Sequence, residues 1–220
     1  MIPPEINRSP EFQDALKQLH KAYRSHRPKI SRRMREFRKL RRAPKRRLFE
    51  ELCFCLLTPQ SNAVSCDSVI RDLRLAGLLL SGGEQELRPF LKRARFYRKK
   101  ASYLVLAREV FLSKDKRDLK KQDPRALRDW LVANIKGLGL KEAGHFLRNI
   151  GLGEDLAILD IHILRRLKTL KVIEEIPSNL SRKKYLEIEE KMRTFSRQCG
   201  IPLGHMDLLF WCMGTGFVFK

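Results

Sequence analysis

A lysine and an aspartate near the middle of the sequence have the types and the spacing to act on an anionic substrate. Lys141 follows Gly137 and Gly139 in "GLGLKEAGHFL", and Asp160 stands nineteen positions later in "LDIH". Glycines before a helix N-terminus bring backbone N–H groups and the positive end of the helix dipole to an anion, so this turn suits a phosphate. A Gly-x-Gly turn is equally typical of an ordinary connection between two helices.

Lys141 and Asp160 each have a simpler interpretation. The lysine lies off the apolar stripe of its helix, where it would face water or a phosphate. Near a helix N-terminus and close to Lys136 and His145, however, its ammonium form is disfavoured, and a nucleophilic lysine must be neutral. Asp160 alone is typical of an N-cap. The combination of glycine turn, lysine and later aspartate is more specific than its parts.

These residues must be positioned by helices. The stretch "DPRALRDWLVANI" predicts a helix capped by Asp123, and a second helix begins just past Gly139, so residues of about 124–150 form a hairpin. Asp160 is expected to open a further helix that turns Ile161 and Leu164 inward. The buried stripe of the second hairpin helix comprises Ala143, Phe146, Leu147 and Ile150.

Helical periodicity extends over nearly the whole chain, broken by short Gly, Pro and Ser stretches such as "HRP", "TPQSN" and "CGIP". The pattern predicts an all-α protein of about ten helices. "LFEELCFCLL" is apolar almost all round and predicts a central helix, after which Ser61 and Asn62 supply a new N-cap.

The charge of the chain points to a polyanionic partner. Its 220 residues include 47 Lys and Arg against 25 Asp and Glu, a formal net charge of +22. Two runs concentrate this charge: Lys21–Arg47, the N-terminal basic run, holds fourteen cations, and Arg88–Lys100, the central basic run, holds seven. Interleaved apolar residues predict an amphipathic helix for each run, although a solvated face or a disordered arm is an alternative for the first. Nucleic acid is the partner that these faces suit.

The cysteines and the apolar runs narrow the class of protein. Five cysteines lie scattered in apolar contexts without ligand spacing, which indicates buried thiols in a reducing compartment and predicts no metal site. No apolar run approaches the length of a membrane span, and the N-terminus resembles no signal peptide. We therefore expect a soluble, intracellular protein.

The stretch "IKGLGLKEAGHFLRNIGLGEDLAILDIHILRRL" resembles the helix-hairpin-helix DNA glycosylase superfamily, which carries a hairpin lysine and a later catalytic aspartate. The resemblance extends from about residue 45 to the end. It implies two helical lobes with the hairpin flanking a DNA-binding groove. In that arrangement residues 1–60 pack with the C-terminal helices, 61–165 form the central lobe ending in the hairpin, and 166–220 complete the first lobe.

Within the superfamily, "CLLTPQSNA", "FYRKKA", "MDLLFW" and "GTGFVFK" are most similar to the second type of 8-oxoguanine DNA glycosylase, found in archaea and bacteria. Endonuclease III-like enzymes share the lysine and the aspartate, but they usually end in a four-cysteine iron–sulfur loop. This C-terminal region has only Cys199 and Cys212. The resemblance therefore implies no iron–sulfur cluster, and it allows a monovalent cation on the hairpin carbonyls.

The resemblance implies a bifunctional repair enzyme. Lys141 would attack the sugar of a damaged purine nucleotide in double-stranded DNA, release the base and cleave the abasic site through a Schiff base. Asp160 would accept a proton or stabilise the cationic sugar. The enzyme would act as a monomer in the cytoplasm of a prokaryote.

The same resemblance assigns the residues that recognise the base and the duplex. Packing in the core is the alternative for the two aromatic residues, and an exposed turn is the alternative for the glutamine. The assigned residues are Phe96 and Trp211 for stacking, Asp207 and Lys220 for the base, Gln60 for the duplex, and Gly137 and Gly139 for the DNA backbone.

Two other functions remain open from the sequence. The first is an endonuclease III-like glycosylase and lyase for other damaged bases. The second is a non-catalytic helix-hairpin-helix module that only holds nucleic acid, which would need basic residues near the hairpin but no carboxylate directed at the same spot.

Overall fold

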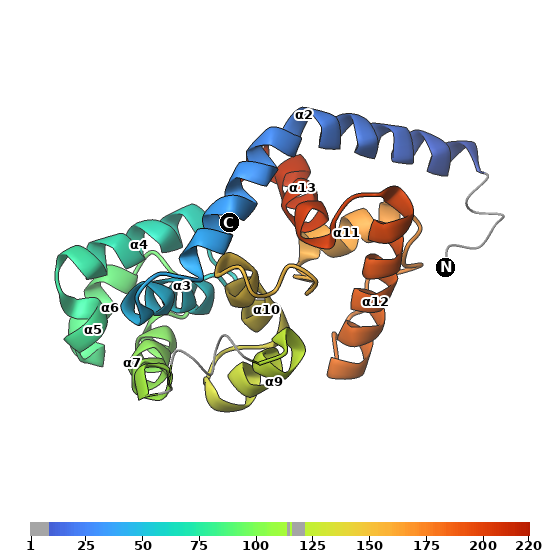
Figure 1. Ribbon diagram of the computed structural model, residues 1–220. Helices are drawn as coiled ribbons and strands as arrows, with labels where there is room; N and C mark the ends of the chain where they lie inside the picture. The colour runs from blue at the N-terminus through green and yellow to red at the C-terminus, as the bar shows by residue number, and fades with distance from the viewer. Residues whose placement is uncertain (1–8, 114, 116–121) are drawn as a thin grey trace. The chain divides into compact units, whose positions relative to one another are not determined.

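A computed structural model describes residues 9–113, 115 and 122–220, and this part of the chain contains eleven helices and no strand (Figure 1). The all-α prediction is confirmed. The chain divides into two compact units: Met1–Phe37 with Gly153–Lys220, the terminal unit, and Arg38–Leu152, the hairpin unit.

The division differs in its bounds from the expected 1–60, 61–165 and 166–220. The first bound lies before α3 (Lys45–Leu57) because this helix packs against α7 (Tyr97–Ser113) and α10 (Leu140–Asn149) of the hairpin unit. The second bound lies after Leu152, so that the segment leading to Asp160 belongs to the terminal unit.

The terminal unit contains most of a long first helix and three C-terminal helices. Its helices are α2 (Pro10–Leu40, of which the last three residues belong to the hairpin unit), α11 (Ile161–Thr169), α12 (Arg182–Cys199) and α13 (Leu203–Thr215). The break expected at "HRP" is absent, because α2 continues through Pro28. Buried side chains on both sides of the proline, including Leu19, Ile30 and Met34, offset the backbone hydrogen bond that proline removes.

Helix α13 is the apolar centre of the terminal unit. It packs against α11 and α12 (Figure 1), and most of its side chains from Leu203 to Cys212 are buried. Helix α2 also contacts α13: a Cβ added to Gly204 would lie 3.0 Å from Met34 Cε. The Tyr23 hydroxyl lies 2.9 Å from His205 Nδ1 at the same end of α13.

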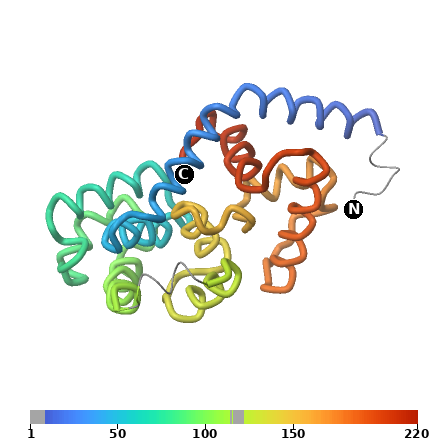
Figure 2. Tube along the Cα trace, in the orientation of Figure 1, coloured from blue at the N-terminus to red at the C-terminus, as the bar shows by residue number. Residues whose placement is uncertain are grey.

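The hairpin unit is built around α3, as the apolar stretch "LFEELCFCLL" predicts. From Leu48 to Leu57 every residue of α3 is buried except Glu50. Helices α3, α7 and α10 pack together, and the path of the hairpin can be followed from green to ochre in Figure 2. The remaining helices are α4 (Ala63–Leu75), α5 (Leu78–Ser81), α6 (Glu84–Leu91) and α9 (Pro124–Asn134).

The central basic run does not form one helix, so this prediction is wrong. Helix α6 ends at Leu91 and α7 begins at Tyr97. Between them Phe96 adopts φ +58°, in the left-handed region that interrupts a right-handed helix. The run is therefore divided between two helix ends and a turn.

Within the residues that the structure describes, no helix has both the length and the apolar character needed to cross a membrane.

Candidate active site

The hairpin follows the local signals of the sequence. Asp123 caps α9 and accepts hydrogen bonds from Arg125 N at 2.9 Å and Ala126 N at 3.0 Å. Gly139 is the N-cap of α10, as expected. Gly137 has φ +94°, and a Cβ added there would clash with the Tyr103 ring. Glycine is therefore required at Gly137 both for its backbone conformation and for its close approach to α7.

Lys141 lies in the first turn of α10, with its side chain 23% exposed. Its Nζ is 3.3 Å from Glu142 Oε1. The other carboxylate oxygen of Glu142, Oε2, accepts a hydrogen bond from Gly139 N at 3.3 Å. One carboxylate therefore joins the amine to the glycine turn, and Lys141 is positioned within its own helical turn.

A second lysine, Lys100 of α7, is buried in the same unit and is 4% exposed. Its Nζ donates to Leu57 O at 2.7 Å, Pro59 O at 2.8 Å and Ser61 Oγ at 3.0 Å. The pKa of Lys100 is lowered to about 8, mainly by burial and to a smaller extent by the Lys141 ammonium, while the Glu142 carboxylate acts in the opposite direction. This amine holds the connection between α3 and α4.

The structure places Gln60 and Phe96 on two exposed turns of the hairpin unit. Gln60 has φ +53° in the α3–α4 connection, and Phe96 is 51% exposed in the α6–α7 connection. Core packing is therefore excluded for Phe96. The guanidinium of Arg95 lies over its ring, with Cζ 4.9 Å from the ring centroid.

Asp160 is the N-cap of α11 in the terminal unit. Its Oδ1 accepts a hydrogen bond from Ile163 N at 2.8 Å. Its other oxygen makes no hydrogen bond with the described residues, so capping leaves half of the carboxylate available. The expected inward orientation of Ile161 is wrong: this side chain is 46% exposed, and Ile163 occupies the buried position instead.

The segment before Asp160 is held by α12. The Tyr185 hydroxyl donates to Ala157 O at 2.7 Å and accepts from Leu159 N at 3.3 Å. Glu189 Oε1 accepts from Ala157 N at 3.0 Å, and Arg193 donates to Asp155 O at 2.9 Å. These contacts fix the backbone that leads into Asp160.

Asp207 and Trp211 lie on α13, which packs against α11. Asp207 is buried, whereas Trp211 and Lys220 are half-buried. The Trp211 ring stacks on Phe219, with centroids 6.1 Å apart and planes at 30°, and meets Phe217 edge-on at 5.2 Å. The residues just before Lys220 are thus packed against Trp211, as the apolar stretch before Lys220 suggests.

The sequence model of one family, described as 8-oxoguanine DNA glycosylase, matches residues 30–201. The chain belongs to this family. A relative from Fusobacterium nucleatum, named 8-oxoguanine DNA glycosylase/AP lyase, is 42% identical over 217 residues, which cover 96% of this chain and 98% of the relative.

Two solved structures of 8-oxoguanine DNA glycosylases share the fold. The Methanocaldococcus jannaschii glycosylase/lyase in complex with a 15mer DNA containing 8-oxoguanine is 39% identical, with a TM-score of 0.85 over 93% of this chain and 99% of that chain. The Thermotoga maritima 8-oxoguanine DNA glycosylase is 37% identical, with a TM-score of 0.87 over 95% of this chain and 100% of that chain.

In this member of the 8-oxoguanine DNA glycosylase family, the hairpin unit carries Lys141, Gly137, Gly139, Gln60 and Phe96. The terminal unit carries the remaining predicted site residues, Asp160, Asp207, Trp211 and Lys220. Each residue keeps its assigned role as a prediction.

Sequence reasoning missed the side chains that position the site in this glycosylase family member. The sequence contains a signal that Lys100 is buried, since this lysine shares the buried stripe of α7 with Leu104, Ala107 and Phe111. Tyr185 also lies on a buried stripe, that of α12. A polar residue on an apolar stripe is the pattern that would have identified both.

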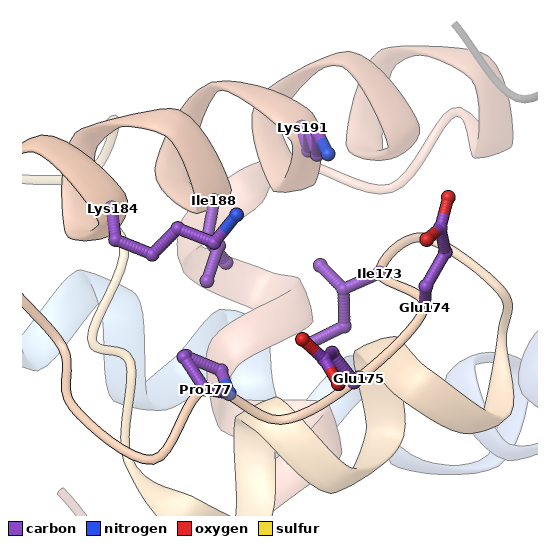
Figure 3. Close-up of a pocket in the computed structure, with 7 residues that line it drawn as sticks. All are labelled: Ile173, Glu174, Glu175, Pro177, Lys184, Ile188 and Lys191. Atoms are coloured by element: carbon purple, nitrogen blue, oxygen red, sulfur yellow. The ribbon is translucent and has the colours of Figure 1, made fainter.

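A surface pocket lies in the terminal unit, on α12 and the connection that precedes it (Figure 3). Ile173, Pro177 and Ile188 line it together with charged residues. Two of the latter, Lys184 and Lys191, are ion-paired with Glu187 at 3.2 and 3.1 Å. None of the predicted site residues lines this pocket. No group of three or more His, Cys, Asp or Glu that could hold a metal ion occurs among the described residues.

Proposed function

We propose that this protein excises 8-oxoguanine from double-stranded DNA and then cleaves the resulting abasic site by β-elimination. Its relatives are named 8-oxoguanine DNA glycosylase/AP lyase. The observation that supports the lyase activity is the position of Lys141, a partly exposed lysine in the first turn of α10 directly after the glycine turn. Such a turn suits a DNA phosphate, so that the amine and the backbone of the substrate would meet.

The reaction begins with extrusion of the damaged nucleotide, because its glycosidic carbon is shielded within the duplex. The neutral Nζ of Lys141 forms a bond to C1′ while the C1′–N bond to the base breaks, and the departing base takes up a proton. Opening of the sugar gives a Schiff base. Loss of a proton from C2′ then expels the 3′ phosphate, and water releases the lysine.

Asp160 supplies negative charge while C1′ becomes cationic. Its Oδ1 is used by the helix cap, whereas the other oxygen is available to the sugar or to the proton of the attacking amine. A fixed carboxylate that meets charge only in the transition state accelerates the step without tightening ground-state binding.

The remaining site residues have recognition roles in this proposal. Phe96 and Trp211 stack on the extruded base, Asp207 and Lys220 contact its polar edge, and Gln60 contacts the duplex. Gly137 and Gly139 let a phosphate come close to the backbone of the turn, where it would replace Glu142 Oε2 as the acceptor for Gly139 N. A monovalent cation on the hairpin carbonyls, the lack of an iron–sulfur cluster, a monomeric state and action in the cytoplasm stay predictions.

Borohydride trapping on a duplex with one 8-oxoguanine tests the proposal. We expect a covalent complex with the wild-type protein and none with Lys141→Gln, while duplex affinity stays nearly unchanged because one charge of 47 is lost. Lys191→Gln is the matched control, since it also removes a lysine paired with a glutamate. Trapping by Lys141→Gln would refute the nucleophile, and binding without trapping by the wild type would favour the non-catalytic module.

A further inference from the structure

The buried ammonium of Lys100 completes the C-terminal end of α3. The carbonyl of Leu57 lies in the last turn of that helix, where carbonyls lack partners within the helix. Leu57 O, Pro59 O and Ser61 Oγ all accept from Lys100 Nζ, within 2.7–3.0 Å. An ammonium has three N–H donors and no acceptor, so three acceptors match its charged form.

Ser61 connects this end of α3 to a second turn. Its Oγ accepts hydrogen bonds from Lys100 Nζ and from Arg95 N, the latter at 2.9 Å. The Ser61 hydroxyl therefore connects the α3–α4 turn (58–62) to the α6–α7 turn (92–96), and Lys100 donates to this hydroxyl. Each of the two carbonyls also accepts one longer hydrogen bond, Leu57 O from Cys66 Sγ at 3.3 Å and Pro59 O from Ser61 Oγ at 3.3 Å. Among the described residues only Lys100 donates to both carbonyls.

Both turns hold a non-glycine residue in the left-handed region, Gln60 at φ +53° and Phe96 at φ +58°. This conformation costs an L-residue on the order of 1 kcal/mol or more and persists where the surroundings enforce it. Both side chains are exposed. Residues held in such strained conformations cluster at active sites and at segments that clamp ligands.

We propose that Lys100 is a positioning residue, whose ammonium fixes the two turns so that Gln60 meets the duplex and Phe96 meets the extruded base. This inference rests on the proposed function. Lys100 has no role as a nucleophile, because its three protons are engaged and its side chain is buried. It acts through the turns, while Lys141 performs the covalent chemistry.

The two activities of the enzyme separate positioning from general stability. Excision of 8-oxoguanine requires a correctly placed base, whereas a preformed abasic site has no base to stack. We expect Lys100→Met to slow single-turnover excision by about 10- to 100-fold, with a smaller loss of cleavage at an abasic site.

Arg108→Met is the matched control. Arg108 also lies on α7 and donates to three carbonyls of one neighbouring segment, Leu78, Leu79 and Gly82. This variant removes a comparable anchor away from both turns, and it should leave the ratio of the two activities unchanged. Equal losses of both activities in Lys100→Met would overturn the inference.

The titration of Lys100 gives a second test, which uses the wild-type protein. Above pH 8 the amine loses a proton and keeps two N–H donors for three acceptors, which loosens the turns. The ratio of excision to abasic-site cleavage should therefore fall as the pH rises from 7 to 9.5. Lys100→Arg, whose guanidinium keeps its charge, should abolish this fall. A wild-type ratio that does not change with pH would contradict the inference.

Chemical denaturation provides a readout that needs no activity. The pKa of Lys100 is lowered in the fold, from 10.5 to about 8. The unfolded chain therefore binds more protons in that window, and the cost of the buried charge, complete below about pH 8, is relieved as the pH rises. The free energy of unfolding of the wild type should rise relative to that of Lys100→Met between pH 8 and 10. If the wild type traps no DNA but shows this shift, the proposed function fails and the buried ammonium remains. Trapping without the shift would refute the lowered pKa of Lys100 and, with it, the expected pH dependence of the activity ratio.

Discussion

The two residues proposed for chemistry are positioned in opposite ways. Lys141 is fixed within its own turn of α10, where the neighbouring Glu142 joins it to Gly139. Asp160 follows a segment whose backbone is held by Tyr185 and Glu189, which lie 25 and 29 positions further along the chain. The position of the proposed nucleophile is thus encoded locally, whereas the position of the carboxylate depends on the packing of a distant helix.

This difference has a chemical reason. A lysine has a long, flexible side chain that can reach C1′ from a range of starting points, and its turn needs only to bring the phosphate near. An aspartate has a short side chain, so its carboxylate is placed by the backbone itself. A displaced backbone at 155–160 would therefore misplace Asp160 directly, and α12 supplies buried polar groups along that segment.

Among the substitutions that test the role and placement of Asp160, Asp160→Asn should have the largest effect on base release. Asparagine caps a helix as well as aspartate does, so the fold is retained. Loss of the charge should slow base release by about 10²- to 10³-fold in single-turnover excision assays.

Asp123→Asn is its counterpart in the hairpin unit, where the carboxylate only caps α9. It should leave base release unchanged. Equal rates for Asp160→Asn and the wild type would reduce Asp160 to a cap and leave Lys141 as the one residue of the pair with a chemical role.

Tyr185→Phe should have a smaller effect, and it tests whether α12 positions the carboxylate. The change removes one buried hydroxyl and leaves Ala157 O and Leu159 N without it, at a cost of about 1–3 kcal/mol in the free energy of unfolding. Base release should fall by about tenfold through displacement of Asp160, while cleavage at a preformed abasic site changes less.

Tyr23→Phe is the control within the same unit, because its hydroxyl pairs with His205 Nδ1 rather than with the segment before Asp160. Denaturation and single-turnover excision should be measured on both variants. A loss of stability in Tyr185→Phe with unchanged base release would show that Asp160 is positioned without α12.

The sequence predicted what depends on neighbouring residues. The Asp123 and Asp160 caps, the glycine turn and the apolar stripe of α10 are all confirmed, because each follows from contacts within one or two helical turns. It failed where the tertiary environment decides. The central basic run has the spacing of one helix, yet the chain turns at Phe96, where Ser61 from another connection binds Arg95 N.

Lys100 shows the same limit. "RKK" contains three cations of similar chemistry, and only the α7 stripe distinguishes Lys100 as the buried one. That it would meet the carbonyls at the end of α3 depends on how α3 and α7 pack. The predicted roles in recognition of the base stay predictions, since they depend on a bound substrate.

The smallest effects are expected when a single positive charge is removed from one of the two basic runs. One residue is chosen in each unit. Arg24 on α2 and Lys99 on α7 are both exposed. Replacing either with glutamine should weaken affinity for undamaged duplex only a few-fold near 0.1 M salt, because each removes one phosphate contact, and should reduce the slope of log K against log salt by about 1.

The double variant distinguishes the two units. If both surfaces meet DNA at once, Arg24→Gln with Lys99→Gln should lower the slope by about 2, whereas Lys191→Gln on α12 should leave it unchanged. A slope that responds to Lys99 alone would confine duplex binding to the hairpin unit, so that the terminal unit contributes its carboxylate but no backbone contact through α2. Fluorescence anisotropy titrations of one labelled duplex at several salt concentrations provide the slopes, and a slope that none of the variants changes would remove both basic runs from the DNA interface.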